Sequence, residues 1–360
     1  MAILRNRVSA LKNLIEPKFD GYIATNPVNL LYLTELLGAA DSLGAAAMLV
    51  PKDGESTLYI YGVNYEWAKA EAKNCTVELV KGNEELTKKV SEQIKSQKLK
   101  TLGFDTMTVK MNKKFSAALK GIAKLEDKPE YVWNLRKIKE KGEIEKIRKA
   151  AKLTVDGMQA AYDAIRPRIS EYQVAAEIEY AMRKNGSYGV AFESSVASGS
   201  RSAYPHGGCG ERRLESGDLV VVDIGARYKN YCADMTRTFV VGNSSTRQEK
   251  IHDVVKEAQE RAFGGIKDGV RAADIDAIAR TFIKKAGFEE NFVHGLGHGI
   301  GLEVHERPTL NSLSKDLLRK GNVITDEPGI YILNFGGFRI EDTVLVKEGK
   351  AERLTRGLYV

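Results

Sequence analysis

The spacing of hydrophobic residues divides the chain into two parts with different patterns. In the first part, short runs rich in β-branched and aromatic residues alternate with segments in which apolar residues recur with helical periodicity. Such alternation is typical of an α/β domain. The predicted strands are 21–25, 45–51, 56–62 and 76–80, and the predicted helices are 2–15, 83–97 and 111–123.

The second part contains longer helical patterns that come in pairs, and each pair is followed by strand-like segments. The predicted order is helices 139–165 and 170–184, strands within 189–242, helices 246–268 and 273–286, and strands within 292–346. This repeated order of elements suggests an internal duplication, although the two halves share no repeat at the level of individual residues.

The domain boundary is expected near residue 128. A charged stretch from Lys124 to Glu130 separates the two patterns, and 360 residues exceed the usual size of one domain. We therefore predict a smaller α/β domain over 1–128 and a second domain over 129–360.

Composition favours a globular protein in a reducing compartment. Hydrophobic residues make up 43% of the chain, which is enough to form sizeable cores, and no apolar run approaches the ~18 residues of a membrane span. The amino terminus lacks the apolar core and cleavage site of a signal peptide. Cys75, Cys209 and Cys232 form no C-x-x-C pair. We expect a cytoplasmic protein without a membrane partner.

The net charge of +7 does not by itself indicate nucleic-acid binding. Basic residues are mixed with acidic ones, as in 81–100 and 136–152, which is typical of solvated helix faces. The chain also lacks a basic platform interleaved with aromatic residues. We therefore predict no nucleic-acid partner.

The segment HGLGHGIGLEVHE, residues 294–306, is a candidate for chemistry because it holds three of the five histidines. Its glycines do not follow the G-x-G-x-x-G of a dinucleotide loop, since Ile300 stands at the position of the third glycine. A zinc-binding helix is disfavoured because each glycine costs up to ~1 kcal/mol in a helix, and His305-Glu306 does not continue as H-E-x-x-H. The pattern favours an extended or looped backbone whose glycines allow close approach.

Two aspartates lie in the strand-like segment GDLVVVDIGARYKNYCADMTRTF, residues 217–239. If its turn centres on Tyr228 and Lys229, Asp223 and Asp234 face each other across an antiparallel pair, with Cβ atoms ~4.5–5.5 Å apart. Two carboxylates on a buried face repel each other and resist ionisation. A bound cation would remove this cost.

Glu327 and Glu341 repeat the arrangement on either side of a loop around 334–337. Four carboxylates with His298 form a five-ligand set dominated by oxygen, which suits two Mn²⁺, Co²⁺ or Fe²⁺ ions, with Zn²⁺ less favoured. Two-metal hydrolytic sites hold their ions ~3.5–4 Å apart, a gap that bridging carboxylates can span. Each acid alone could be an ordinary turn or strand-edge carboxylate, but the five together predict a dinuclear metal site.

These segments resemble the metallopeptidases with the creatinase or "pita-bread" fold, and within them the prolidases and Xaa-Pro aminopeptidases. The resemblance rests on ASGSRSAYPHG (197–207), GDLVVVDIGARYKNYCADMTRTF, HGLGHGIGLEVHE, EPGIY (327–331) and RIEDTVLV (339–346), which occur in family order. In the first part, only NPVNLLYLTELLG (26–38) resembles the family's amino-terminal domain. The resemblance implies an α+β protein in which a pita-bread catalytic domain follows a smaller α/β domain.

Carried over motif by motif, the resemblance implies five metal ligands, two of which, Asp234 and Glu341, bridge the ions. The implied ligands are Asp223, Asp234, His298, Glu327 and Glu341. Among the other implied site residues, His206 and His305 contact the substrate and stabilise the tetrahedral intermediate, His294 lines the substrate pocket, and Arg339 and Tyr331 support a ligand or contact the substrate.

Four residues have no role in this resemblance. Asp326 and Phe338 depart from the family pattern, which usually has an apolar residue before the ligand at 327 and a smaller residue before the arginine at 339. His252 is predicted to be a surface histidine on a helix. Cys209 lies three residues from His206, but catalytic partners meet in space rather than in sequence, and a packing role is favoured.

The expected reaction is peptide hydrolysis by a hydroxide that bridges two metal ions, because coordination lowers the pKa of water toward neutrality. Glu327 would carry the proton to the leaving nitrogen, and Arg339, assisted by His206 and His305, is the candidate to bind the free carboxylate of a dipeptide. We thus expect a prolidase that cleaves Xaa-Pro dipeptides. The alternatives are an Xaa-Pro aminopeptidase acting on longer peptides and a non-catalytic peptide-binding module of the same fold. The resemblance also implies a homodimer.

Overall fold

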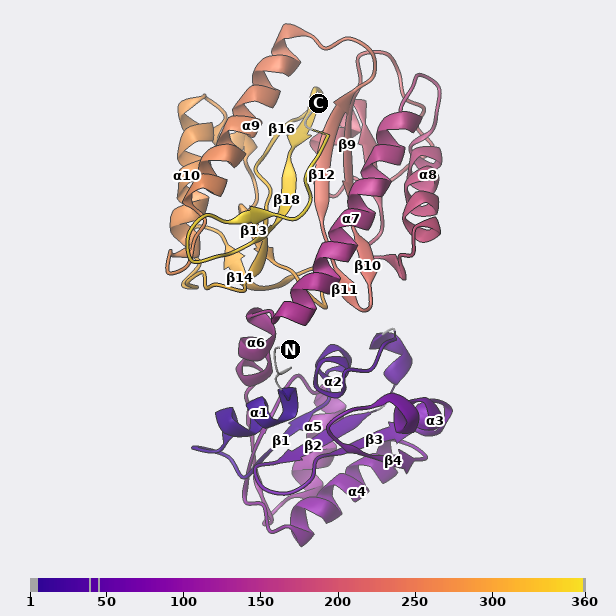
Figure 1. The fold of residues 1–360 in the computed structure, drawn as a ribbon, viewed down its shortest axis with the longest axis vertical. Coiled ribbons are helices and arrows are strands. Elements are labelled where there is room, and N and C mark those ends of the chain that lie inside the picture. The colour runs from indigo at the N-terminus through magenta and orange to yellow at the C-terminus, as the bar shows by residue number, and fades with distance from the viewer. Residues whose placement is uncertain (1–5, 39, 45, 359–360) are drawn as a thin grey trace. The chain divides into compact units, whose positions relative to one another are not determined.

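The computed structural model describes residues 6–38, 40–44 and 46–358, and the chain forms two compact units (Figure 1). The first unit spans Met1–Arg136 and the second spans Lys137–Val360. The sequence pattern placed the boundary near residue 128. The charged stretch there contains strand β6 (Lys124–Asp127), whose polar side chains suit its place at the edge of the first unit's sheet.

A six-stranded mixed sheet with the order β4-β3-β2-β1-β5-β6 forms the centre of the first unit. Its strands are β1 (Gly21–Ala24), β2 (Ala47–Pro51), β3 (Thr57–Tyr61), β4 (Thr76–Val80), β5 (Thr101–Phe104) and β6. Its helices are α1 (Arg7–Ile15), α2 (Pro27–Thr34), α3 (Gly62–Glu71), α4 (Asn83–Ser96), α5 (Val109–Ala118) and α6 (Glu130–Lys137), with a 3₁₀ turn at Ala40–Leu43. The predicted α/β amino-terminal domain is confirmed.

Helix α2 was not predicted from hydrophobic periodicity. Asn29–Thr34 are all buried, so the segment shows no polar face and no helical period. Its start is nevertheless encoded locally, because the Asn26 side chain accepts hydrogen bonds from the backbone N–H groups of Val28 and Asn29, and Pro27 occupies the first turn. Helix α1 is described from Arg7 onward, and the predicted residues 2–5 lie outside the described part of the chain.

The second unit is built from two helix pairs and an eight-stranded sheet, in which seven strands have the order β14-β13-β15-β18-β12-β9-β8 and β19 pairs with β18. Its helices are α7 (Lys141–Ala164), α8 (Glu171–Lys184), α9 (Thr246–Gly265) and α10 (Ala272–Lys285), with 3₁₀ turns at Gly199–Ala203 (η2) and Glu289–Asn291 (η3). Its strands are β7 (Gly189–Val190), β8 (Ser195–Ser198), β9 (Leu219–Ile224), β10 (Ala226–Tyr228), β11 (Tyr231–Cys232), β12 (Met235–Val240), β13 (Gly297–Gly299), β14 (Glu306–Leu310), β15 (Val323–Asp326), β16 (Gly329–Ile332), β17 (Gly336–Arg339), β18 (Glu341–Leu345) and β19 (Glu352–Arg353).

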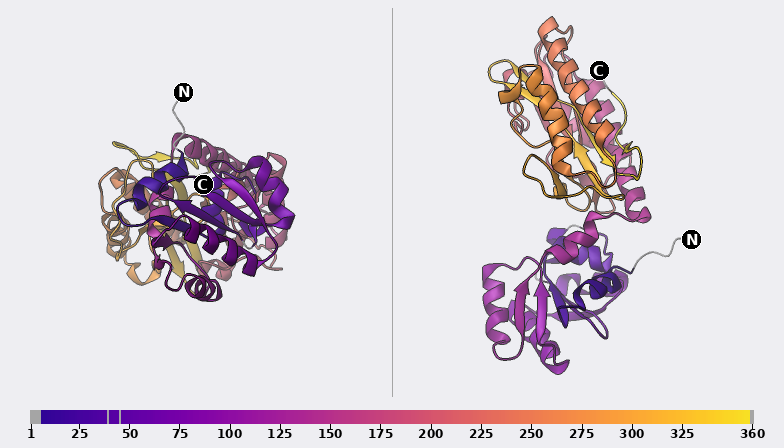
Figure 2. Two further views of the ribbon diagram at one scale, coloured as in Figure 1. Left: turned by 90° about the horizontal axis from the view of Figure 1, so that it is seen from below. Right: turned by 90° about the vertical axis from the view of Figure 1, so that its left-hand side faces the viewer.

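The two helix pairs cover different halves of the same sheet. Helices α7 and α8 pack on β8, β9 and β12 through a core that includes Ile178, Val222 and Met235. Helices α9 and α10, which lie side by side in Figure 2 (right), pack on the other half through residues such as Ile275 and Ile324. The repeated order of helix pair and strands is therefore confirmed, as is the predicted pita-bread catalytic fold.

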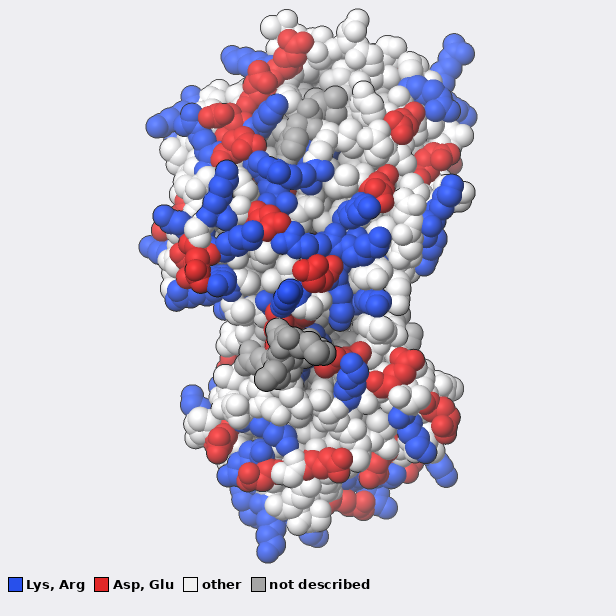
Figure 3. Space-filling view, in the orientation of Figure 1, with Lys and Arg blue, Asp and Glu red and all other residues white. Residues whose placement is uncertain are grey.

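Strand alternation sends polar residues to the face of the sheet that the helices leave open. In β9, Val220, Val222 and Ile224 point into the helical core, so Asp223 points to the opposite face. Acidic and basic side chains lie among one another over both units on the face drawn in Figure 3. Within the described residues, no helix combines the length and apolar character that crossing a membrane requires.

Candidate active site

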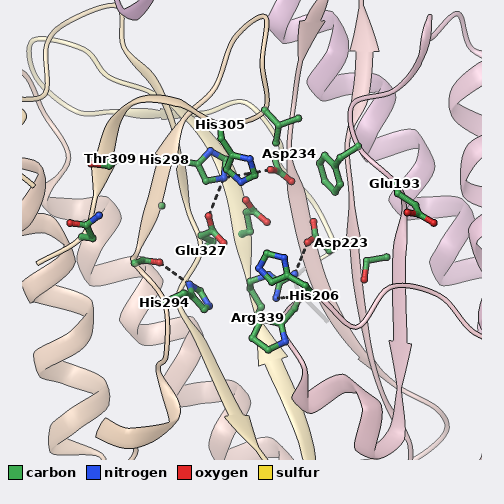
Figure 4. Close-up of a pocket in the computed structure, with 18 of the residues that line it drawn as sticks. Glu193, His206, Asp223, Asp234, His294, His298, His305, Thr309, Glu327 and Arg339 are labelled. Atoms are coloured by element: carbon green, nitrogen blue, oxygen red, sulfur yellow. Dashed lines mark hydrogen bonds and ion pairs between the residues drawn. The ribbon is translucent and has the colours of Figure 1, made fainter. Parts of the chain in front are cut away.

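The five predicted metal ligands line one cavity of about 520 Å³ on the open face of the sheet (Figure 4). They come from five chain segments that the fold brings together. Asp223 lies in β9, Asp234 directly precedes β12, His298 is the centre of β13, Glu327 directly follows β15, and Glu341 begins β18.

The hairpin between the two aspartates turns at Lys229 and Asn230, so the predicted turn at Tyr228 and Lys229 was wrong by one residue. Both turn residues have positive φ, +45° and +71°, as tight two-residue hairpins require, and asparagine tolerates that conformation. Asp223 is consequently paired with Thr236 rather than with Asp234. The two aspartates lie diagonally on the same face of the hairpin, which still leaves them close enough to share a site.

Glu327 and Glu341 stand beside the next strand pair. Asp326 pairs with Asp342 and Gly329 with Arg339, and this register places the two glutamates opposite each other. The turn of this hairpin comprises Leu333–Phe335, slightly earlier than the predicted loop.

His298 lies on an extended strand, as the glycine pattern predicted. A Cβ atom at Gly297 would lie 2.2 Å from the backbone oxygen of Thr325, and one at Gly299 would lie 2.3 Å from that of Arg307. Only glycine fits between these neighbouring strands. The close packing fixes the backbone on both sides of His298 and aims its ring into the cavity.

Three of the five groups form a tight cluster. Single ligand atoms of Asp234, His298 and Glu341 all lie within 4.8 Å of one another. The Nε2 atom of His298 is also 3.3 Å from Oε1 of Glu327. Nδ1 of the same ring lies 3.1 Å from the backbone oxygen of Gly299. With a cation bound in place of the Nε2 proton, donation from Nδ1 would leave the Nε2 lone pair facing that cation.

The carboxylates have oxygen atoms that the protein leaves unpaired. Oδ1 of Asp223, Oδ1 of Asp234 and Oε1 of Glu341 are buried and have no hydrogen-bond partner within the described residues. Buried polar atoms normally have partners, so three such oxygens in one cavity are a strong sign of a missing ligand. The donor set of carboxylates and one imidazole fits divalent cations of the Mn²⁺ or Co²⁺ type.

The pKa values of the clustered carboxyl groups also indicate a missing cation. Burial, together with repulsion by neighbouring carboxylates, raises the pKa values of Asp234 and Glu341 well above the ordinary range. Burial also opposes ionisation of Glu327, but hydrogen bonding and charge from His298 outweigh it and lower the pKa of Glu327 to about 2. Like charges held this close need a compensating cation to be ionised together.

Arg339 supplies part of that compensation. Its guanidinium is almost completely buried and donates to Oδ2 of Asp223 at 2.6 Å and to the hydroxyl of Tyr331 at 2.7 Å. The Tyr331 hydroxyl in turn lies 3.0 Å from Nε2 of His294. Burial lowers the pKa of His294, so this ring is neutral near pH 7. Arg339 and Tyr331 therefore connect a predicted ligand to a predicted substrate-pocket histidine.

The other two predicted site histidines also line the cavity. The ring of His305 lies 4.3 Å from that of His298, measured between centroids, and burial with the nearby His298 lowers the pKa of His305. His206 lies on the loop after η2 and faces the cavity from the opposite side in Figure 4.

Three threonines that the sequence analysis did not identify hold the predicted site residues in place. The Thr236 hydroxyl donates to Oε2 of Glu341 at 2.5 Å and accepts from Nε of Arg339 at 3.1 Å. The Thr325 hydroxyl donates to Oε1 of Glu327 and accepts from the backbone N–H of His298, both at 3.0 Å. Thr238 bonds the backbone of Arg339. Their even spacing from Asp234, and the place of Thr325 two residues before Glu327, put them on the same face as the ligands and could have indicated them.

His252 and Cys209 lie outside the cluster. His252 lies on α9, but its side chain is only 19% exposed, so the prediction of a surface histidine was wrong on its exposure. His252 lines a separate cavity, where its ring packs near Phe338. Burial raises the pKa of the Cys209 thiol to about 11, and its Sγ donates to the backbone oxygen of Ser194. A thiol with such a pKa is a poor nucleophile.

Asp326 carries a buried carboxyl group with no evident structural role. Neither of its oxygens has a hydrogen-bond partner in the described part of the chain, and it stands opposite Asp342, whose charge Arg237 neutralises at 2.9 Å. We predict that Asp326→Val stabilises the protein by about 1–3 kcal/mol, because burying an unpaired polar group costs about that much. Thermal or denaturant unfolding will measure the change.

Asp342→Val is the matched control, because it removes the same group from the directly opposed position. It should destabilise the protein by about 3–5 kcal/mol, since Arg237 would lose its buried partner. A clear loss of stability in Asp326→Val would contradict this interpretation of Asp326.

Comparisons with known proteins agree with the geometry. The model described as "Metallopeptidase family M24" matches residues 145–348, and that of the "Creatinase/Prolidase N-terminal domain" matches 7–138. An Xaa-Pro dipeptidase of Pyrococcus furiosus is 41% identical over 98% of both chains. Among solved structures, an Xaa-Pro dipeptidase from Bacillus anthracis has a TM-score of 0.91 and 35% identity, covering 98% of this chain and 97% of its own. An X-Pro aminopeptidase from Thermotoga maritima has a TM-score of 0.87 and 35% identity, covering 97% and 98%.

Proposed function

This chain belongs to metallopeptidase family M24, and on that premise we propose that it is an Xaa-Pro dipeptidase that works with two divalent metal ions. The observation that carries the proposal is the set of unpaired carboxylate oxygens around His298 in one cavity. A non-catalytic peptide-binding module of the same fold is disfavoured, because such a module has no need to assemble these buried like charges.

The residues that would hold the metal ions are Asp223, Asp234, His298, Glu327 and Glu341. When bound, Mn²⁺ or Co²⁺ ions would polarise the scissile carbonyl and lower the pKa of water toward neutrality, which supplies a nucleophile. Because burial and mutual repulsion raise the pKa values of Asp234 and Glu341, a cation that enters the cavity would favour their ionised forms and displace protons from them.

Glu327 and three histidines outside the ligand set have further proposed tasks. Glu327 is ionised at neutral pH and would carry a proton to the leaving nitrogen. His305 and His206 would contact the substrate and donate to the oxygen that becomes negative during attack. His294 would line the substrate pocket, with its ring held by Tyr331 and by the backbone oxygen of Gly295.

The choice between a dipeptidase and an aminopeptidase depends on the free carboxylate of the substrate. The cations and imidazoles lining the cavity are Arg339, His206, His294, His298 and His305. We expect cleavage of Leu-Pro and Met-Pro, with kcat/KM about tenfold to a hundredfold lower for Leu-Pro-amide, because one charge-assisted contact is lost. Leu-Pro, Leu-Pro-amide, an Xaa-Pro-Xaa tripeptide and Met-Ala should be compared under identical metal conditions.

Two results of that comparison would change the assignment. Equal or faster cleavage of the tripeptide would indicate an Xaa-Pro aminopeptidase, the activity named for the similar Thermotoga maritima structure. Preference for Met-Ala would reject proline specificity.

We also propose a cytoplasmic homodimer, which rests on the family resemblance and on the cysteine content. Sedimentation equilibrium at micromolar concentration should give twice the chain mass of 39.8 kDa. A mass equal to one chain would overturn the dimer.

A further inference from the structure

We propose that Arg201, oriented by the buried carboxylate of Glu171, is a positioning residue for His206. This inference deepens the proposed function and rests on it for the role of His206, while the geometry that carries it is independent of any substrate. Glu171 and Arg201 lie outside the metal cluster and do not line the active-site cavity.

The position of the His206 ring depends on its backbone. Within the described residues, the ring makes no hydrogen bond or ion pair, although it lines the cavity. His206 is the third residue of a tight turn, in which the backbone N–H of Gly207 donates to the oxygen of Tyr204 at 3.0 Å. Pro205 precedes it and restricts the backbone. Contacts that fix the backbone of this turn therefore also fix the position of the His206 ring.

Two arginines hold the turn through the carbonyl groups on either side of His206. NH1 of Arg339 lies 3.4 Å from the oxygen of Pro205. NH2 of Arg201 donates to the oxygen of Gly207 at 2.7 Å, which is the shorter and stronger contact. Arg339 also holds Asp223, so its contact with the turn cannot be tested separately. Arg201 has no contact with a metal ligand and can be tested alone.

Glu171 fixes the direction of the Arg201 side chain. It begins helix α8 and is completely buried, and its Oε2 forms an ion pair with Nε of Arg201 at 3.4 Å, although neither atom makes a hydrogen bond among the described residues. Its Oε1 accepts from both the backbone N–H and the hydroxyl of Ser198, at 2.8 and 2.7 Å. The carboxylate thus ties α8 to the end of β8 and leaves one oxygen for the arginine. A buried acid at the first turn of a helix is also favoured by the helix dipole.

The loop from Gly207 to Gly210 passes close to Glu171 and Arg201. A Cβ atom at Gly210 would lie 3.0 Å from Oε2 of Glu171, and one at Gly207 would lie 3.2 Å from the backbone oxygen of Arg201. The backbone therefore passes close to both members of the pair where a larger residue would push it away. The Arg201 side chain is 37% exposed, so a stabilising role alone would be modest, whereas a positional role requires only the single contact to Gly207.

A double-mutant cycle tests the inference. Arg201→Met should lower kcat/KM for Leu-Pro about tenfold or more, because displacing a reacting group by about 1 Å can cost a hundredfold. In the His206→Ala background, the same substitution should change kcat/KM less than threefold, since the ring it positions is gone. Arg201→Lys, which keeps the charge but only one contact, should fall in between. Metal content should stay at the level of the unmodified protein.

Arg183→Met is the matched control. Arg183 lies on α8, the helix that Glu171 begins, and it donates to two backbone oxygens, those of Ser187 and Tyr188, which lie outside the His206 turn. It should leave kcat/KM within twofold. Equal losses from Arg183→Met and Arg201→Met, or equal losses from Arg201→Met with and without His206, would overturn the positioning role.

A second readout does not depend on activity. The imidazole proton resonances of His206, assigned by comparison with His206→Ala, should shift or broaden in Arg201→Met and stay unchanged in Arg183→Met. Shifted resonances without Xaa-Pro hydrolysis by the unmodified protein would refute the proposed substrate and retain the inference. Unchanged His206 resonances in Arg201→Met would overturn the inference, whatever the substrate.

Discussion

Asp234→Asn is expected to abolish peptidase activity and to remove most of the bound metal. Asp234 offers a ligand atom within 4.8 Å of those of both His298 and Glu341, and no described residue forms a hydrogen bond with its buried Oδ1. Replacing one oxygen by an amide nitrogen removes both the charge and one ligand position. Loss of several kcal/mol of transition-state stabilisation corresponds to a decrease in kcat of about a thousandfold or more. Glu341→Gln should have the same effect.

Activity and metal content must be measured on the same preparations. Exhaustive chelation should inactivate the unmodified protein, and Mn²⁺ or Co²⁺ should restore it but not Asp234→Asn. Asp326→Val provides the control, because it removes a buried carboxyl one residue from Glu327 that does not line the cavity. This control should retain metal and activity. Full activity of the unmodified protein after chelation, or two ions per chain in both Asp234→Asn and Glu341→Gln, would refute the proposed centre.

The sequence was sufficient to predict the long amphipathic helices and the ligand-bearing strands. Helices α7–α10 each have one apolar face, so their periodicity is visible, and the acids that end apolar runs at Asp223 and Glu327 stand out against them. The glycines around His298 were informative for a related reason. No side chain fits between those strands, and the sequence therefore shows glycine wherever the backbones meet.

Features that depend on contacts between distant segments could not be predicted. The turn lies at Lys229 and Asn230, one residue later than predicted, and this shifted the pairing of Asp223 by two residues, from Asp234 to Thr236. Burial on all sides hid helix α2. The isolation of Asp326 and the bond between Arg201 and Gly207 depend on which strands and loops become neighbours, and the chain alone does not state this.

Replacing Arg339 should also have a large effect, in this case on the stability of the protein. Arg339→Met would leave the carboxylate of Asp223, whose side chain is 21% exposed, beside Glu327 and Glu341 without its cation. Breaking a fully buried pair costs about 3–5 kcal/mol, so we expect a loss of up to about 3 kcal/mol for this partly exposed one. The loss should be greatest in the presence of a chelator, because bound metal would neutralise the same carboxylate. Unfolding with and without Mn²⁺ will measure this difference.

Tyr331→Phe is the control for the polar network around Arg339. It removes one hydrogen bond to the arginine but leaves the contact with Asp223 intact, and it should cost only about 1 kcal/mol. If Arg339→Met is no more destabilising than Tyr331→Phe, then Arg339 does not balance the charge of Asp223.

Substrate dependence separates the two tasks that Arg339 can have. If it holds Asp223, Arg339→Lys should lower kcat by the same factor for Leu-Pro and Leu-Pro-amide, because the defect lies in the metal centre. If it binds the free carboxylate of the dipeptide, the loss should appear in KM and only for Leu-Pro. The buried guanidinium, with donors already directed to Asp223, Tyr331 and Thr236, favours the first result. The contact with the free carboxylate of the dipeptide would then come from His206 or His305. Replacing either histidine should then change the difference in kcat/KM between Leu-Pro and Leu-Pro-amide.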